Sequence, residues 1–222
     1  MNLIELDDYT LAPAGSSHGL APCHISIGKN DVWAIEADFI DDAHQFLRGL
    51  ATLDRPVSGT YRYQGQIVDF NNHQMLLELK RKIGFIAPDT SLISNRTLRE
   101  NLLLMRYYDE NSLNITLDDK IYDLCRKFDL YDKLDQRPGQ LLPNEFRTAI
   151  AIREISKPLE LLLLDRPEDV VAHDRIDLFA DLLQSIIDVG HPVVLYTSKQ
   201  TLVSRFAKAT LQLKKGCLTM LN

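Results

Sequence analysis

The sequence predicts an α/β fold with a mostly parallel core sheet, short alternating β segments and a charged helical stretch at 105–140. Largely apolar runs at 32–35, 161–164 and 193–198 have the length and composition of buried strands. Segments with apolar residues at helical spacing, 46–53 and 145–156, come between them. Strands that alternate with helices are typical of a parallel sheet that is buried on both faces.

Short alternating segments predict further strands, and the family resemblance given below implies that they form an antiparallel β subdomain. Residues 3–6 and 23–27 alternate apolar and polar side chains, as half-buried strands do, and a turn at 12–17 separates them. Tyrosines and aliphatic residues at 61–68 lie on both sides of Gly65, which predicts a hairpin.

Length and composition indicate a single domain, 1–222, with a proper hydrophobic core. The chain has a mass of 25.3 kDa, and 45% of its residues are hydrophobic. No apolar run reaches the length of a membrane span, and the amino terminus lacks the basic region of a signal peptide. We therefore expect a cytoplasmic protein, with peripheral attachment to the cytoplasmic face of a membrane as the alternative.

Charge and the metal-binding residue types exclude two further classes of function. The formal net charge of −6 argues against nucleic acid as the main partner, because phosphate binding needs a basic face. The three cysteines are far apart and form no CxxC pair, so we expect reduced thiols. The six histidines form no HxxxH or HxH cluster, and we predict no metal site.

The loop after the first core strand has the layout of a phosphate-binding loop but lacks its residues. The pattern GxxxxGK[ST] needs glycines whose amides face the phosphates, a lysine for the β/γ oxygens and a hydroxyl for Mg²⁺. The four informative positions hold Ala37, Asp42, Ala43 and His44. The setting of a nucleotide site is present, but its chemistry is missing.

The same loop is acidic. Its carboxylates are Glu36, Asp38, Asp41 and Asp42. At about 4 Å and an effective dielectric constant near 20, each would oppose a phosphate charge by on the order of 4 kcal/mol. We expect Asp41 or Asp42 to serve as the N-cap of the following helix and to satisfy its free amides. The alternative is a cation site, which would require these acids to converge.

Two segments carry a resemblance to a known family. Residues 54–66 resemble the segment L-x-R-P-x-S-G-x-x-x-x-x-G of ABC-transporter ATPase subunits, and 80–102 resemble that family's I-G-Y-V-x-Q-D-x-x-L-x-x-x-x-T-V-x-E-N-L. The resemblance extends over nearly the whole chain. It implies the P-loop NTPase-like ABC ATPase fold, with 1–87 and 158–222 as the core plus β subdomain and about 88–157 as the helical subdomain.

The resemblance also identifies the nucleotide-handling positions that differ. Pro88 stands at the family's glutamine, Leu142 at the signature serine, Arg166 at the catalytic glutamate and Ser198 at the switch histidine. Asp165, which ends the Walker B strand, is retained. We therefore expect neither ATP hydrolysis nor tight ATP binding, and we predict no catalytic residue and no cofactor.

The resemblance implies partners as well. In the family, the segment after the glutamine and the helical subdomain receive a helix of the membrane subunit. We predict that Asp89, Arg96 and Arg99 bind this helix; the alternative is that the pattern of this segment serves core packing. Asp174 aligns with the aspartate of the family's subunit-contact loop.

These observations predict a non-catalytic ABC-transporter ATPase-like subunit that acts through protein–protein interaction. Its expected partner is a membrane permease, a second ABC ATPase subunit, or both, and a homodimer is also compatible with the sequence. Two alternatives stay open: an ATPase subunit with weak nucleotide binding, and a regulatory module that holds a small ligand in the vacated pocket.

Overall fold

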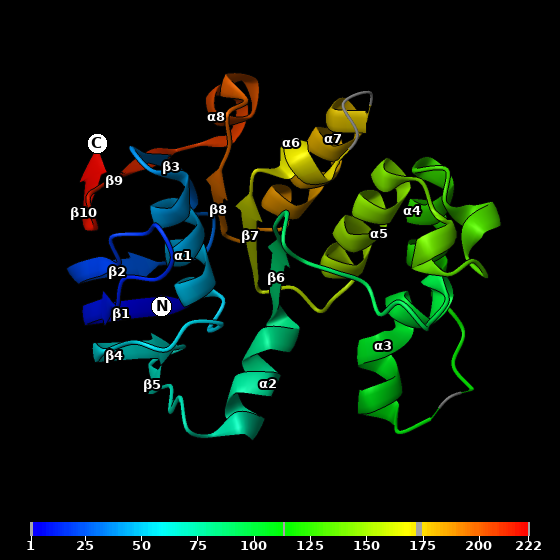
Figure 1. Ribbon diagram of the computed structural model, residues 1–222, viewed down its shortest axis with the longest axis horizontal. Coiled ribbons are helices and arrows are strands. Elements are labelled where there is room, and N and C mark those ends of the chain that lie inside the picture. The colour runs from blue at the N-terminus through cyan, green and yellow to red at the C-terminus, as the bar shows by residue number, and fades with distance from the viewer. Residues whose placement is uncertain (1, 113, 172–174, 222) are drawn as a thin grey trace.

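Two sheets with one helix between them form the body of the molecule, and a group of helices lies at the other end (Figure 1). The computed structural model describes residues 2–112, 114–171 and 175–221. The larger sheet has six strands in the order β10 (Cys217–Leu221), β9 (Ala209–Lys214), β3 (Val32–Ala37), β8 (Val193–Tyr196), β7 (Leu161–Asp165) and β6 (Ile83–Ile86). The smaller sheet has four strands in the order β2 (Leu20–Ile27), β1 (Ile4–Leu11), β4 (Ser58–Tyr63) and β5 (Gln66–Ile67).

Helices join and cover these strands. They are α1 (Ile40–Leu50), α2 (His73–Lys82), α3 (Leu98–Glu110), α4 (Asp119–Lys127), α5 (Pro143–Ile155), α6 (Pro167–Val170), α7 (Ile176–Asp188) and α8 (Gln200–Phe206). Two short 3-10 helices, η1 (Tyr131–Lys133) and η2 (Pro138–Gln140), connect α4 to α5. The described residues include no helix that has both the length and the apolar character needed to cross a membrane.

The larger sheet is parallel from β9 to β6, and β10 adds an antiparallel edge. The central strand, β3, lies between β8 and β9, so Val32 is opposite Val193 and Trp33 is opposite Ala209. The prediction of a mostly parallel core sheet with an antiparallel subdomain is confirmed.

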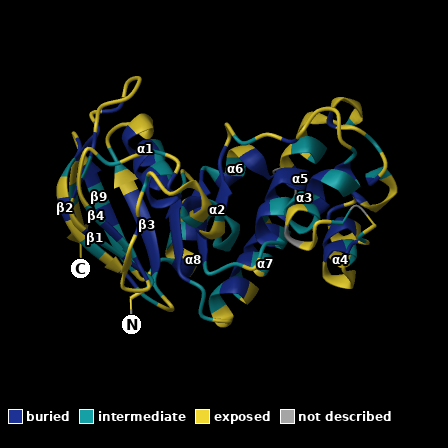
Figure 2. Ribbon diagram, turned by 90° about the horizontal axis from the view of Figure 1, so that it is seen from below, coloured by how far each residue is buried: buried dark blue, intermediate teal, exposed yellow. Residues whose placement is uncertain are grey.

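Alternate residues of the core strands face two separate hydrophobic clusters. On β7, Leu162 and Leu164 enter one cluster, while Leu161 and Leu163 enter the other. Because both faces are covered, the strand has the continuous apolar run from which it was predicted. Figure 2 shows β3 as a buried strand, with exposed positions on the outer strands of the smaller sheet and on parts of the helices.

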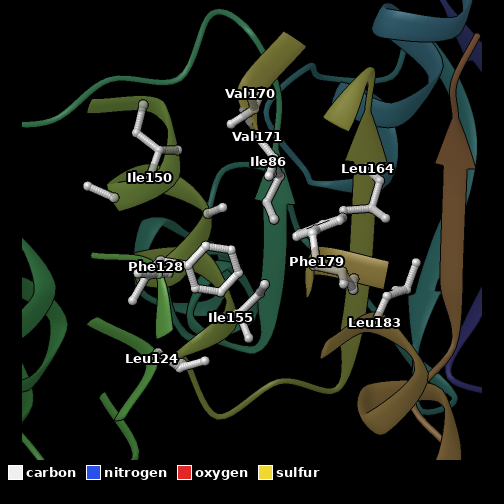
Figure 3. Packing of buried hydrophobic residues seen from close by; sticks show 14 of the residues in the cluster. Ile86, Leu124, Phe128, Ile150, Ile155, Leu164, Val170, Val171, Phe179 and Leu183 are labelled. Carbon is white, nitrogen blue, oxygen red and sulfur yellow. The ribbon is translucent and has the colours of Figure 1, made fainter. Parts of the chain in front are cut away.

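The first cluster lies between the sheet and the helical end of the molecule (Figure 3). Phe179 and Leu183 of α7 pack on the strands in this cluster. Ile150 and Ile155 of α5 belong to the same cluster, as does Phe128, which follows α4. The second cluster encloses α1 between the two sheets. Its members include Phe46, Leu47 and Leu50 of α1, Tyr9 of β1 and Tyr61 of β4. Helix α1 is thus held from both sides, and its amino-terminal turns form one wall of the candidate site.

Two helix boundaries differ from the expectation, and one predicted residue lies outside the described part of the chain. Leu53, assigned to the first helix by its spacing, follows the end of α1, and 41% of its surface is exposed. Helix α5 begins at Pro143, a residue that fits the first turn because it needs no backbone donor there. The predicted subunit-contact residue Asp174 lies outside the described residues.

Candidate functional site

The candidate site lies at the edge of the core sheet where the parallel strands end. Strand β3 ends at Ala37, and α1 begins only three residues later, at Ile40. The ends of β3 and β7 and the beginning of α6 lie at the same edge (Figure 1). Sites of parallel α/β sheets generally form at this edge, because loops from several strands meet there.

The amino terminus of α1 is not capped in the way the sequence suggested. The N-cap position is Phe39, which has no side-chain acceptor, and the amide of Asp42 donates to the carbonyl of Phe39. The helix starts earlier than expected, so Asp41 and Asp42 lie inside its first turn. Their negative charges in this turn are still stabilised by the positive end of the helix dipole. The N-cap prediction for Asp41 or Asp42 is therefore wrong.

Asp42 holds the loop between β1 and β2 against α1. Its side chain is buried, and it accepts hydrogen bonds from Ser17 Oγ (2.9 Å), the His18 amide (2.7 Å) and His18 Nδ1 (3.0 Å). The ring of His18 also lies against that of Phe39, with 4.7 Å between the centroids. A carboxylate at the position of a loop glycine is thus satisfied by the protein itself.

The other loop positions point in different directions. Ala43, at the position of the lysine, is fully buried in the cluster around α1 and offers no charge. Glu36, Asp38 and Asp41 are not buried with Asp42. Because Asp42 turns inward to Ser17 and His18, the four acids do not converge, and among the described residues no group of acids, histidines and cysteines has the arrangement of a metal site.

The shortest contact of the site joins α1 to the end of β7. His44 Nδ1 donates to Asp165 Oδ2 at 2.5 Å, across a sequence separation of 121 residues. Asp165 is fully buried, while 26% of the His44 side chain is exposed. The hydrogen bond to Asp165 is the largest influence on His44, and it raises the pKa of this histidine although partial burial works against it. An imidazolium at this place neutralises the buried carboxylate.

Arg166 brings a second cation to the same carboxylate. It lies at φ +46°, in the left-handed region, directly after β7. Its Nε is 3.6 Å from Asp165 Oδ1, and its Nη1 is 3.2 Å from Asp169 Oδ2. Within the described part of the chain, neither Asp165 Oδ1 nor Arg166 Nε forms a hydrogen bond. Opposite charge without hydrogen bonding therefore links these two groups.

Glu168 belongs to the site although its sequence position did not predict this. Its carboxylate accepts hydrogen bonds from Thr197 Oγ1 (2.6 Å), the Ser198 amide (2.6 Å) and Ser198 Oγ (2.7 Å). Burial raises the pKa of Glu168, but these hydrogen bonds outweigh it, and the net change is a lowering of that pKa. The sequence could have indicated this site, because Glu168 follows the core strand β7 and the hydroxyl residues Thr197 and Ser198 follow the neighbouring strand β8. The carboxyl ends of neighbouring strands meet at one edge of a parallel sheet.

Pro88 lies in the segment that leads from β6 to the helical end of the molecule, and Leu142 lies at the start of α5. Pro88 is exposed and follows β6 by two residues. Leu142 is the N-cap of α5, 59% of its surface is exposed, and its amide donates to Glu145 Oε2 at 2.8 Å. At the position of the signature serine, the helix start is thus satisfied by a glutamate of the same chain.

The three residues predicted to bind a partner protein each form an ion pair within the chain itself. Asp89 Oδ2 lies 3.4 Å from Arg48 Nη1 and 3.5 Å from His44 Nε2. Arg96, which precedes α3, pairs with Glu100 in the first turn of that helix at 3.0 Å. Arg99 donates to Asp135 at 2.9 Å and to Tyr122 Oη at 3.0 Å.

The donor set at this edge does not fit a magnesium–nucleotide complex. Such a complex needs a loop lysine, a hydroxyl on the metal and a free strand-end aspartate. Here Ala43 is buried, His44 replaces the hydroxyl, and the same histidine already uses one oxygen of Asp165. The arrangement can pair charges and hold segments together, and we derive no reaction step from it.

The chain is similar in sequence and in structure to proteins that contain ATP-binding cassettes. No family model matches it. The macrolide export ATP-binding/permease protein MacB of Campylobacter jejuni is 27% identical over 193 residues, which are 86% of this chain and 30% of that protein. MacB of Vibrio parahaemolyticus is 27% identical over 219 residues, or 96% of this chain and 33% of that protein. The chain spans about a third of the length of the curated relatives it matches.

Solved structures agree over the whole chain. A dimeric post-hydrolysis state of the ATP-binding cassette MJ0796, bound to ADP and Pi, superposes with a TM-score of 0.82 at 18% identity and covers 99% of this chain and 98% of that one. A second dimeric structure of MJ0796, a bacterial ABC transporter cassette, gives a TM-score of 0.81 at 18% identity and covers 97% of this chain and 96% of that one.

Proposed function

We propose that this chain, which has the ABC ATPase cassette fold, is a transporter subunit that works with a membrane permease and does not hydrolyse ATP. The fold supports the first part, together with relatives that are named as ATP-binding/permease proteins. The second part rests on the chemistry at the carboxyl edge of the sheet. Fold alone does not fix activity, so the residues of the site decide the proposal.

The observation that carries the non-catalytic part is the contact between His44 and Asp165. A protein cation lies against the buried acid, in the space between the loop motif and the Walker B strand. The place of the catalytic carboxylate holds Arg166, whose charge is opposite. No carboxylate at that place can therefore take a proton from an attacking water.

The surface proposed for the permease is a groove beside the segment that follows β6. The groove has a volume of about 230 Å³, and apolar atoms form most of its wall. It is lined by Ala51, Leu53, Lys80, Ile83, Phe85, Thr90, Glu154 and Lys157. A helix that buries an apolar side chain beside the exposed Leu53 would fit this wall, and acidic groups on that helix would meet Lys80.

We include Asp89, Arg96 and Arg99 in this proposed interface, and the structure indicates how each of them could contact the permease. The side chains of Asp89 and Arg96 are about half exposed, which leaves them accessible. Arg99 is already engaged by Asp135 and Tyr122. A partner would therefore contact Arg99 together with the acid it holds.

Calorimetry tests the nucleotide part of the proposal. Titration with Mg-ATP at millimolar concentration should give no binding heat, and the thermal midpoint should not move. A dissociation constant below about 100 μM, roughly −5.5 kcal/mol, would contradict it. A nucleotide-binding ABC cassette titrated in the same buffer serves as the control for the assay.

Affinity purification from the native host tests the partner part. A permease, with or without a second ATPase subunit, should be recovered with the tagged chain. Arg96→Glu combined with Arg99→Glu should abolish this recovery. The swap of Arg99→Glu with Asp135→Arg keeps an internal ion pair, so loss of the partner in that variant would separate binding from folding. Full recovery of the permease with both variants would remove these residues from the interface.

A further inference from the structure

Helix α1 presents two cations on one face, and each is oriented by its own carboxylate. His44 and Arg48 are four residues apart and therefore lie on the same side of the helix. His44 is held by Asp165, as described above. Arg48 donates from Nε to both oxygens of Asp54, at 3.1 and 3.2 Å, and from Nη2 to Asp54 Oδ1 at 2.9 Å. Both cations are thus fixed in direction before a third group is considered.

The third group is Asp89, and both cations reach it. One oxygen of this carboxylate lies 3.4 Å from Arg48 Nη1 and 3.5 Å from His44 Nε2. Asp89 begins the segment 89–97, which runs from the end of β6 to α3. This segment also provides Thr90 to the wall of the groove. The clamp formed by His44, Arg48 and Asp89 therefore joins α1 to the groove.

The middle of the segment is fixed by different residues. Asn101, which is fully buried in α3, accepts from the amide of Ile93 at 2.7 Å and donates to its carbonyl at 3.1 Å. Arg153 of α5 donates to the carbonyl of Ser91 at 2.7 Å. These contacts hold the middle of the segment to the helical end of the molecule, while Asp89 holds its beginning to the core.

We propose that His44 and Arg48 are positioning residues: through Asp89 they hold the segment 89–97 in place, so that the shape of the groove does not depend on a bound nucleotide. This inference rests on the proposed function, because the groove is the proposed permease surface. The protein supplies its own cations at the edge of the sheet, and they bind both the strand-end acid and the first acid of the segment. With His44 protonated, each acid of the cluster has a cation beside it: three cations, His44, Arg48 and Arg166, face four acids, Asp54, Asp89, Asp165 and Asp169.

Residue-resolved hydrogen exchange tests the clamp in the free protein. The amide of Thr90, which donates to the carbonyl of Ala87, should exchange at least about threefold faster in Asp89→Ala than in the wild type. The amide of Ile93 should stay unchanged, because Asn101 holds it. Asp89→Glu should restore the wild-type rate at Thr90. Asp181→Ala, which removes an exposed acid paired with Arg205 on another surface, is the matched control.

Two results in the Asp89→Ala variant would overturn the proposal: an unchanged exchange rate at Thr90, or an equal increase at Thr90 and Ile93, which would indicate general loosening. Addition of Mg-ATP to the wild type should leave the Thr90 rate unaltered. Protection of Thr90 by Mg-ATP would show that nucleotide, and not the clamp, sets the segment.

Recovery of the permease is the second readout. Asp89→Ala should reduce it at least about tenfold, and Asp89→Glu should recover most of it. Wild-type recovery by Asp89→Ala would refute a role of the clamp in docking. If the wild-type chain recovers no permease, the proposed function fails, whereas the exchange experiment still decides whether the clamp exists. The two failures are therefore distinguishable.

Discussion

Replacing His44 with alanine should lower the free energy of unfolding by about 2–3 kcal/mol. The variant leaves Asp165 as a fully buried carboxylate that has lost its 2.5 Å hydrogen bond. Among the described residues its other oxygen forms no hydrogen bond, and it lies 3.6 Å from Arg166 Nε. Breaking one partner of a buried pair generally costs about 3–5 kcal/mol. We expect less here because 26% of the His44 side chain is exposed, and water can reach the vacated space.

A double-mutant cycle isolates the pair itself. Asp165→Asn keeps the shape but removes the charge, and it should cost about 1–2 kcal/mol. Once the charge is gone, removal of His44 loses mainly packing, so the two costs should not add. The expected coupling is about 1–2 kcal/mol. Urea denaturation at constant m value measures each corner of the cycle. Additivity within about 0.5 kcal/mol would show that the contact contributes no energy of its own.

The coupling should also depend on pH in one direction. The folded-state pKa of His44 is raised above its ordinary value of 6.5, chiefly by the Asp165 hydrogen bond. The unfolded chain therefore loses this proton at a lower pH than the folded chain does. The stabilisation is complete below about pH 6.5 and is lost as the pH rises through the folded-state pKa. A coupling that grows between about pH 6 and pH 9 would contradict the assignment of a protonated His44.

Three other predictions follow from contacts outside this pair. Glu168→Gln should cost about 1–3 kcal/mol near neutral pH, and the loss should diminish as the pH falls through the lowered folded-state pKa of Glu168, which urea titrations at several pH values would show. Burial raises the pKa of the Cys23 and Cys125 thiols to about 11, so a thiol reagent near pH 8 should modify Cys217 first, with one equivalent reacting before unfolding; fast reaction of three thiols would refute this. Gly59→Ala should destabilise the protein by about 1–3 kcal/mol in thermal melts, because Gly59 has φ +84° and an added Cβ would lie 2.2 Å from a backbone carbonyl; a melting temperature equal to the wild type would disprove it.

The fold was predictable because the strands of a parallel sheet are buried on both faces. The run 161–164 consists of four leucines, and in a chain of this composition so short and continuous an apolar run is typical of a buried strand. The boundaries of helices were less certain. A carboxylate near the start of a helix can cap it or lie in its first turn, and Asp42 is drawn into the turn by Ser17 and His18.

The site was predictable only as a set of positions. Spacing from the strands located Ala43, His44 and Asp165, but it could not show that His44 reaches an acid 121 residues away. Contacts of this kind depend on how strand ends meet in space, and the order of residues along one chain does not record that. Glu168 was missed for the same reason, since its partners follow the neighbouring strand.

The position of β3 in the middle of the larger sheet has a consequence for synthesis of the chain. Its neighbours, β8 and β9, begin at Val193 and Ala209, so an apolar strand that ends at Ala37 has to wait for residues made much later. At roughly 5–20 residues per second on the ribosome, the wait is on the order of 10–30 s. During this time the strand is an unpaired edge that can join other chains. Such non-local pairing also slows folding, so the nascent chain should depend on chaperones more than a helical protein of the same size.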